Sequence, residues 1–251
     1  MKLAISGKGG VGKTTFSALL IRTLSDMGKK VLAIDADPDA NLAAALGVAD
    51  NDQPVPIAEM KEMIFERTGA QPGSIGGFFK LNPKVDDLPD SLSVKKENIK
   101  LMRLGSVKKG GGGCLCPEST LLKALVMHIV LARDEVVVLD MEAGIEHLGR
   151  ATAKAVDKLI VVVEPGRRSI DTAEHIRRLA AEIHLDQIAV VGNKIRTAND
   201  EDFLRRHLKD FEILGFLPYA DALIEADLNG QSPYDVPSAA KERVGEMIAL
   251  L

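Results

Sequence analysis

The chain has 251 residues, of which 46% are hydrophobic, 27% are charged and 4% are aromatic, and its formal net charge is −4. This length is enough to bury a hydrophobic core. The slightly acidic balance speaks against a nucleic-acid partner, because proteins that bind nucleic acids usually present a basic face. The lack of tryptophan also leaves little material for stacking single-stranded bases.

The sequence predicts neither a secretory signal nor a membrane anchor. The apolar run in the first ten residues, MKLAISGKGG, is too short for a signal peptide. The longest internal apolar runs, such as residues 159–163, fall far below the ~18 residues of a membrane span. Cys114 and Cys116 are the only cysteines, which favours a reducing compartment. We therefore expect a cytoplasmic protein with no membrane partner.

Short apolar runs alternate with helix-length amphipathic segments along most of the chain. The expected strands are residues 2–6, 31–35, 99–105, 136–140, 159–163, 188–192 and 213–217. The expected helices are residues 13–27, 57–67, 117–132, 168–183, 199–208 and 238–251. Strands that are apolar on both faces and separated by helices indicate a mostly parallel sheet covered on both sides. The sequence thus predicts a doubly wound α/β fold.

Residues 48–98 interrupt this alternation. They contain five of the eleven prolines and only one helix-like segment. We interpret residues 1–251 as a single domain in which residues 48–98 form an insertion or a lid.

The segment GKGGVGKT, residues 7–14, fits the pattern G-x-x-x-x-G-K-[ST] of a phosphate-binding loop between a strand and a helix. Glycines let successive backbone N–H groups turn toward phosphate oxygens, and the helix N-terminus adds its positive end. In such a loop, Lys13 reaches the β- and γ-phosphates and Thr14 binds Mg²⁺. The nucleotide site predicted here comprises Gly7, Lys8, Gly9, Gly10, Val11, Gly12, Lys13, Thr14 and Thr15.

With its second lysine, Lys8, the segment KGGVGKT resembles the deviant phosphate loop of a class of P-loop ATPases. That class includes the nitrogenase iron protein, the Min-system and plasmid-partition ATPases, and metallocentre maturation factors. In these families the equivalent lysine reaches the nucleotide of a partner subunit. The resemblance implies a catalytic role for Lys8 in an ATP-dependent homodimer. The alternative is that Lys8 is only a solvated charge on the loop.

Two aspartate-containing segments follow expected strands, and the resemblance gives roles to both. In the first switch segment, residues 35–41 (DADPDAN), it implies that Asp37 orients the attacking water and that Asp35 lies near the Mg²⁺ shell. Phosphoryl transfer needs mainly positioning and charge compensation, so one well-placed carboxylate is enough. The alternative is a structural turn.

The second switch segment, residues 140–144 (DMEAG), ends another buried strand. Here the resemblance implies that Asp140 holds a Mg²⁺-bound water and that the N–H of Gly144 bonds the γ-phosphate. Taken alone, an aspartate at a strand end is weak support, because strands often finish in this residue.

The class contacts the base at a position that corresponds to Asn193 in VVGNKIR, residues 190–196. GTP-binding proteins use N-K-x-D there, and the aspartate accepts two guanine N–H bonds. The fourth residue here is Arg196, which can only donate. We therefore expect ATP as the nucleotide, with Pro218 and Tyr219 of a later loop against the base.

Both cysteines lie in GGGGCLCPE, residues 110–118, which also follows an expected strand. Ligands of open α/β sheets bind beyond the carboxyl ends of strands, so this segment and the nucleotide site should share one edge. Pro117 suits the first position of a helix, which places Cys116 at a helix N-terminus, where thiolates are favoured. Two such chains would supply four sulfur ligands, which suit Zn²⁺, Ni²⁺ or an iron–sulfur cluster. Incidental thiols or a redox pair are the alternatives.

Together, KGGVGKTT, DADPDANLA, GCLCPE and DMEAGIEHLGR resemble the CooC-type ATPases that mature carbon monoxide dehydrogenase, over nearly the whole chain. The resemblance implies an ATP-hydrolysing metallochaperone that delivers nickel to that enzyme's metal cluster. It also implies that Cys114 and Cys116 of two subunits hold Ni²⁺ or Zn²⁺.

Two rival interpretations stay open. One is an ATP-driven electron carrier similar to the nitrogenase iron protein, but that family takes its cluster cysteines from two separate loops. The other is a spatial-positioning ATPase of the Min or partition type, which would need a basic surface or an amphipathic C-terminal anchor. The net charge and the core-like spacing of apolar residues in 238–251 supply neither.

Overall fold

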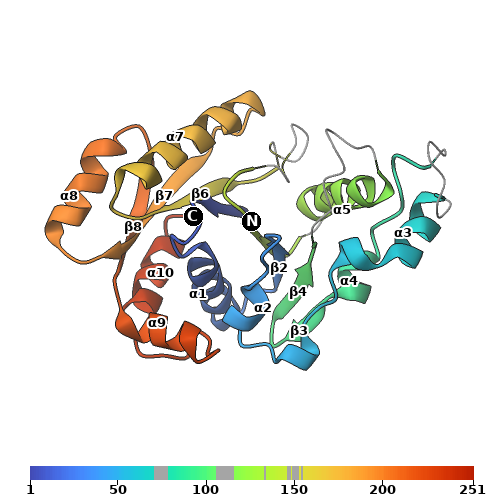
Figure 1. The fold of residues 1–251 in the computed structure, drawn as a ribbon, viewed down its shortest axis with the longest axis horizontal. Coiled ribbons are helices and arrows are strands. Elements are labelled where there is room, and N and C mark those ends of the chain that lie inside the picture. Colours follow the sequence, from blue (N-terminus) through green and yellow to red (C-terminus); the bar gives the residue numbers. More distant parts are fainter. Residues whose placement is uncertain (71–78, 106–115, 133, 146–147, 149–152, 154) are drawn as a thin grey trace.

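The structure is a computed structural model that describes every residue except 71–78, 106–115, 133, 146–147, 149–152 and 154. Its described residues form one eight-stranded sheet with helices on both faces (Figure 1). No helix among them is long and apolar enough to pass through a bilayer.

The strands follow the order β3-β4-β2-β5-β1-β6-β7-β8 across the sheet. All neighbours are parallel except β3 and β4. This arrangement confirms the predicted mostly parallel α/β fold. The strands are β1 (Lys2–Gly7), β2 (Val31–Ala36), β3 (Val94–Lys96), β4 (Ile99–Arg103), β5 (Val136–Met141), β6 (Lys158–Val163), β7 (Ile188–Ile195) and β8 (Glu212–Pro218).

Strand β3 is the one described strand that the sequence did not predict. It has only three residues, Val-Lys-Lys, and none of them is buried. It pairs with β4 through a tight turn in which Glu97 has a φ of 53°. The apolar runs that mark buried strands are absent from so short an edge strand.

The helices pack on both faces of the sheet. They are α1 (Lys13–Asp26), α2 (Leu42–Ala45), α3 (Lys61–Thr68), α4 (Leu88–Leu92), α5 (Pro117–Ala132), α7 (Arg167–Glu182), α8 (Ala198–His207), α9 (Asp221–Leu228) and α10 (Ala240–Ile248). Two 3₁₀ turns, η1 (Asp50–Asp52) and η2 (Ile57–Glu59), complete the described elements. Of these, α2, α4, α9 and η1 lie outside the expected helical ranges.

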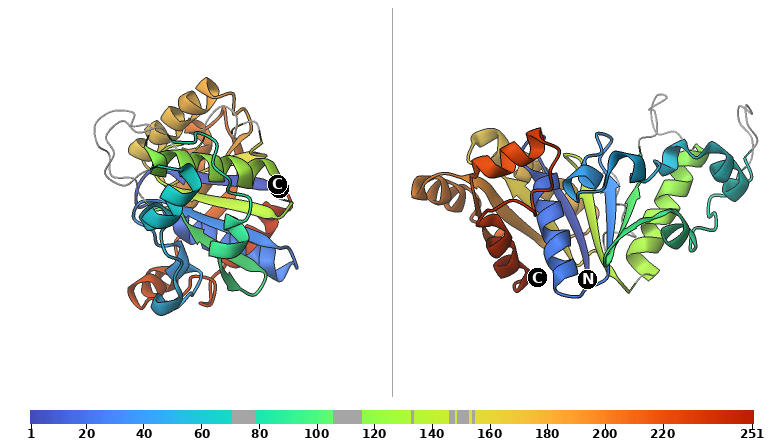
Figure 2. Two further views of the ribbon diagram at one scale, coloured as in Figure 1. Left: turned by 90° about the vertical axis from the view of Figure 1, so that its right-hand side faces the viewer. Right: turned by 90° about the horizontal axis from the view of Figure 1, so that it is seen from below.

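Two hydrophobic cores lie on opposite faces of the sheet, because neighbouring residues of a strand point to opposite sides. On β1, Leu3 and Ile5 belong to one core, whereas Ala4 belongs to the other. Helices α1 and α10 contact each other and cover the first core (Figure 2). Helices α5 and α7 cover the second. Burial on both faces explains why the central strands read as continuous apolar runs.

Residues 48–98 contribute η1, η2, α3, α4 and β3. Their described elements pack beside α5 and β4, at the end of the molecule where β3 closes the sheet (Figure 1). Through β3, this segment adds one edge strand to the sheet. A function as a lid remains a prediction.

Candidate nucleotide-binding site

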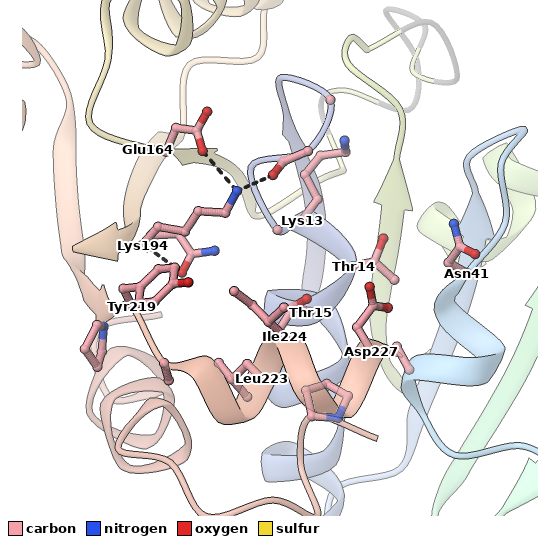
Figure 3. Close-up of a pocket in the computed structure, with 18 of the residues that line it drawn as sticks. Lys13, Thr14, Thr15, Asn41, Glu164, Lys194, Tyr219, Leu223, Ile224 and Asp227 are labelled. Atoms are coloured by element: carbon pink, nitrogen blue, oxygen red, sulfur yellow. Dashed lines mark hydrogen bonds and ion pairs between the residues drawn. The ribbon is translucent and has the colours of Figure 1, made fainter. Parts of the chain in front are cut away.

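A cavity of about 970 Å³ opens at the carboxyl edge of the sheet (Figure 3). Segments that follow β1, β2, β6, β7 and β8 meet there, together with α9. The predicted residues that line it are Gly9, Gly10, Gly12, Lys13, Thr14, Thr15, Asp37, Asn193, Pro218 and Tyr219. Gly7, Lys8, Val11, Asp35, Asp140 and Gly144 do not line it. One edge of the sheet thus collects most of the predicted nucleotide site.

The phosphate-binding loop has a backbone that requires glycine at two points. Gly10 has a φ of 79°, and Gly12, the residue before α1, has a φ of 92°. A Cβ on Gly12 would also collide with the amide of Asn193. Lys13, the first residue of α1, is only 8% exposed. The loop is therefore shaped to present backbone N–H groups and one buried cation to an anion.

Asn193 holds the phosphate-binding loop in place. Its Nδ2 donates to the carbonyl oxygen of Val11 at 2.8 Å, and its Oδ1 accepts the N–H of Lys194 at 2.8 Å. Both polar atoms of the amide are therefore engaged within the protein. Asn193 also lines the cavity. Its contact with the base remains a prediction.

Asp140, at the carboxyl end of β5, has one oxygen engaged and one oxygen without a donor. Its Oδ1 accepts the hydroxyl of Ser17 at 2.9 Å, whereas its buried Oδ2 has no hydrogen-bond partner within the described part of the chain. Burial raises the pKa of Asp140 to about 6, against the opposing effects of Thr14, Ser17 and Lys13. An unpartnered carboxylate oxygen next to Thr14 fits Mg²⁺ or a water bound to it.

Lowering the pH through about 6 is expected to weaken MgATP binding, because Asp140 then becomes protonated. Its pKa of about 6 means that the carboxylate is ionised above this pH and neutral below it. Calorimetric titration between about pH 5 and about pH 8 should show an affinity loss approaching tenfold per unit below pH 6. Asp140→Asn should bind more weakly and lose this component of the profile. Identical pH profiles for both proteins would contradict the assignment.

Asp35 is buried, and its carboxylate holds the backbone of the first switch segment in place. Its Oδ1 accepts the N–H of Asp37 at 3.3 Å, and its Oδ2 accepts the N–H of Leu42, the first residue of α2, at 3.0 Å. Burial raises the pKa of Asp35 to about 7, and the neighbouring carboxylate of Asp140 adds to the rise. The structure thus gives Asp35 a positioning role, and its place near a Mg²⁺ shell stays a prediction.

Hydrogen bonds from Ser232 and Lys96 hold the other end of α2 in place. Ser232 Oγ donates to the carbonyl oxygen of Ala45 at 2.7 Å. Lys96 Nζ donates to the carbonyl oxygens of Leu46 at 2.8 Å and Gly47 at 2.6 Å. Since residues beside Ser232 line the cavity, these hydrogen bonds link the first switch segment to the cavity wall that follows α9. No local pattern in the sequence indicates these contacts.

Ser6, at the end of β1, organises the second switch segment. Its buried Oγ donates to the carbonyl oxygen of Gly144 at 2.8 Å and to that of Glu142 at 3.1 Å. The N–H of Gly144 meanwhile donates to the carbonyl oxygen of Glu142 at 2.7 Å. A bond from this N–H to a γ-phosphate, which remains a prediction, would require that turn to open.

The wall of the cavity where we predict the base to bind combines an aromatic ring with apolar side chains. The guanidinium of Arg196 lies 3.7 Å from the centroid of the Tyr219 ring, a cation–π contact that fixes both side chains. Leu223 and Ile224 of α9 complete this wall (Figure 3). The sequence prediction included Pro218 and Tyr219 but missed α9, whose short helix carries only a weak apolar pattern.

Of the two predicted metal ligands, Cys114 lies outside the described residues. Cys116 directly precedes α5 and caps it: the N–H of Thr120 donates to its carbonyl oxygen at 3.0 Å, and the N–H of Ser119 to its Sγ at 3.4 Å. The predicted position at a helix N-terminus is therefore confirmed. Within the described part of the chain, no cluster of three or more His, Cys, Asp or Glu residues could hold a metal.

Residues 2–234 match the family described as the CobQ/CobB/MinD/ParA nucleotide binding domain, and the chain belongs to this family. The chain is also 45% identical over 253 residues to the carbon monoxide dehydrogenase accessory protein CooC of Rhodospirillum rubrum, which covers 100% of this chain and 96% of that protein. An ATP-binding protein of Methanocaldococcus jannaschii is 45% identical over 246 residues, 96% of this chain and 94% of that protein. The predicted resemblance to CooC-type proteins is thereby confirmed.

Among solved structures, the septum site-determining protein MinD of Pyrococcus horikoshii, complexed with Mg-ADP, superposes with a TM-score of 0.67 at 20% identity. The match covers 98% of this chain and 93% of that chain. A ParA family ATPase of Chlorobium tepidum gives a TM-score of 0.70 at 18% identity, with 100% and 98% coverage. These likenesses confirm the fold.

Proposed function

We propose that the protein is an ATP-hydrolysing metallochaperone that delivers nickel to carbon monoxide dehydrogenase as a homodimer. The observation that carries the proposal is the position of Cys116. It directly precedes α5, the helix that connects the carboxyl end of β4 to β5, on the edge where the nucleotide cavity opens. The full-length similarity to the CooC accessory protein supports the same acceptor.

In this proposal, ATP binds to the phosphate-binding loop. The backbone N–H groups before α1 and the buried ammonium of Lys13 hold its phosphates. Thr14 and Asp140 would hold Mg²⁺ beside the phosphates, where the ion would neutralise charge on the phosphate oxygens. Asp37, which lines the cavity, orients the attacking water. Lys8 reaches the nucleotide of the second subunit, so that ATP favours pairing.

The metal is the cargo, and its binding is coupled to pairing in the same way. Cys114 and Cys116 of one chain supply two soft ligands, and the paired chain supplies two more, which completes a four-sulfur site for Ni²⁺ or Zn²⁺. Because ATP and metal both favour the dimer, each should tighten the binding of the other. Hydrolysis then separates the chains and releases the metal to the acceptor.

The test is a nickel titration followed by sedimentation, with and without a nonhydrolysable ATP analogue. The wild type should bind about one Ni²⁺ per dimer, and the analogue should tighten this binding by about 5- to 150-fold. The double variant Cys114→Ser/Cys116→Ser should lose both metal binding and metal-driven pairing. Met127→Ser changes an exposed sulfur residue of α5 and serves as the matched control. Stoichiometric nickel binding that survives loss of both thiols would overturn the metal site.

A further inference from the structure

Glu164, which directly follows β6, places a carboxylate at the wall of the nucleotide cavity. Its Oε2 lies 3.1 Å from Lys194 Nζ, and its Oε1 lies 4.0 Å from Lys8 Nζ. Lys194 Nζ also donates to the carbonyl oxygen of Gly10 at 2.6 Å (Figure 3). One carboxylate thus contacts two lysines, one of them from the phosphate-binding loop.

A carboxylate in this position needs a specific reason, because it opposes the binding of a polyanion. Lys194 provides part of the answer by pairing closely with Glu164. The backbone of Lys194 has a φ of 58°, an uncommon value for a residue with a side chain, and lies within a register irregularity between β7 and β8. Such a backbone persists only where the surroundings support it, here through the Asn193 side chain. The ion pair between Lys194 and Glu164 is therefore held in place by the surrounding structure.

Lys8 is the looser of the two partners of Glu164. Its 4.0 Å separation is at the limit of an ion pair, and its side chain is 36% exposed. Ion pairs of this kind contribute little and exchange readily. The contact can therefore direct Lys8 toward its own chain without preventing its departure.

We propose that Glu164 is a positioning residue that holds Lys8 on its own chain in the unpaired protein. Lys194 sets the strength of this contact by sharing the same carboxylate. The inference rests on the proposed function, in which Lys8 leaves its own chain to reach the nucleotide of a second copy. Pairing then requires two Lys8–Glu164 contacts to break, one in each chain.

This arrangement predicts effects of opposite sign for the two partners of the pair. Glu164→Gln removes the charge that retains Lys8, so pairing becomes easier. Lys194→Met removes the competing cation, so Glu164 attracts Lys8 more strongly and pairing becomes harder. A merely structural role of the pair would instead loosen the phosphate-binding loop in both variants and shift both in one direction.

The experiment measures the dimer dissociation constant of each full-length variant by sedimentation with Mg²⁺ and a nonhydrolysable ATP analogue. Glu164→Gln should lower this constant about two- to tenfold, and Lys194→Met should raise it by a similar factor. The control variant is Glu212→Gln, which breaks a 2.9 Å ion pair with Lys158 at the other end of β6. It should leave the dimer dissociation constant unchanged. Nucleotide affinity measured on dilute monomers shows whether the loop is intact.

The outcomes separate this inference from the proposed function. In one outcome the wild type pairs, but the dissociation constants of Glu164→Gln and Lys194→Met shift in the same direction or not at all. This result would overturn the role of Glu164 and leave the proposed function standing. A wild type that stays monomeric with the analogue and with nickel would overturn both.

Discussion

Replacement of Asp37 by asparagine is expected to lower kcat for ATP hydrolysis by about 100- to 1,000-fold, with little change in ATP affinity. Asp37 lines the cavity, and its Oδ1 accepts the N–H of Asp39 at 3.0 Å. Asparagine keeps an oxygen for that backbone contact, so the first switch segment should retain its shape. It lacks the negative charge that orients the attacking water in the proposed mechanism. Phosphate release under single-turnover conditions would measure the loss.

Asp39→Asn is the matched control for this prediction. Asp39 also lines the cavity, lies two residues away and is exposed, yet it has no assigned part in the reaction. Its kcat should stay within a few-fold of the wild type. If Asp37→Asn hydrolyses ATP at the wild-type rate, the water-orienting carboxylate lies elsewhere. A slow Asp37→Asn protein should also accumulate as the ATP-bound dimer in sedimentation.

Replacing each of the two lysines of the phosphate-binding loop by glutamine is expected to impair different steps, ATP binding for Lys13 and pairing with hydrolysis for Lys8. Lys13 is buried at the start of α1, so Lys13→Gln should reduce ATP affinity in the monomer by about 100-fold or more, through the loss of a charge-assisted contact in a desolvated site. Lys8 lies at the rim, with a side chain that is 36% exposed. Lys8→Gln should therefore bind ATP as a monomer but neither pair nor hydrolyse efficiently.

Fluorescent-nucleotide binding at low protein concentration and sedimentation at high concentration distinguish these two defects. A lysine supplied across an interface contributes to kcat much as an arginine finger does, by a factor of about 1,000 or more. Normal pairing and hydrolysis by Lys8→Gln would reduce Lys8 to a solvated loop charge, and the proposed dimer mechanism would fall with it.

Local sequence patterns were enough to predict much of the fold and the core of the site. Short apolar runs identified every central strand, because a strand buried on both faces consists mostly of apolar residues. The glycine spacing of residues 7–14 identified the phosphate-binding loop, since the backbone conformations at Gly10 and Gly12 are accessible mainly to glycine. The side chain of Arg196 can only donate hydrogen bonds, and this property alone argued against a guanine site.

The residues that arrange these parts became apparent only from the fold. Lys194 and Gly10 are 184 positions apart, and Ser6 and Gly144 are 138 apart. They meet because β1 lies next to β5 and only one strand away from β7, and no spacing rule along the chain encodes that strand order. Glu164 illustrates the same limit, since a glutamate after a strand is unremarkable in sequence. Its significance arises because the sheet brings two lysines from distant segments to a single carboxylate.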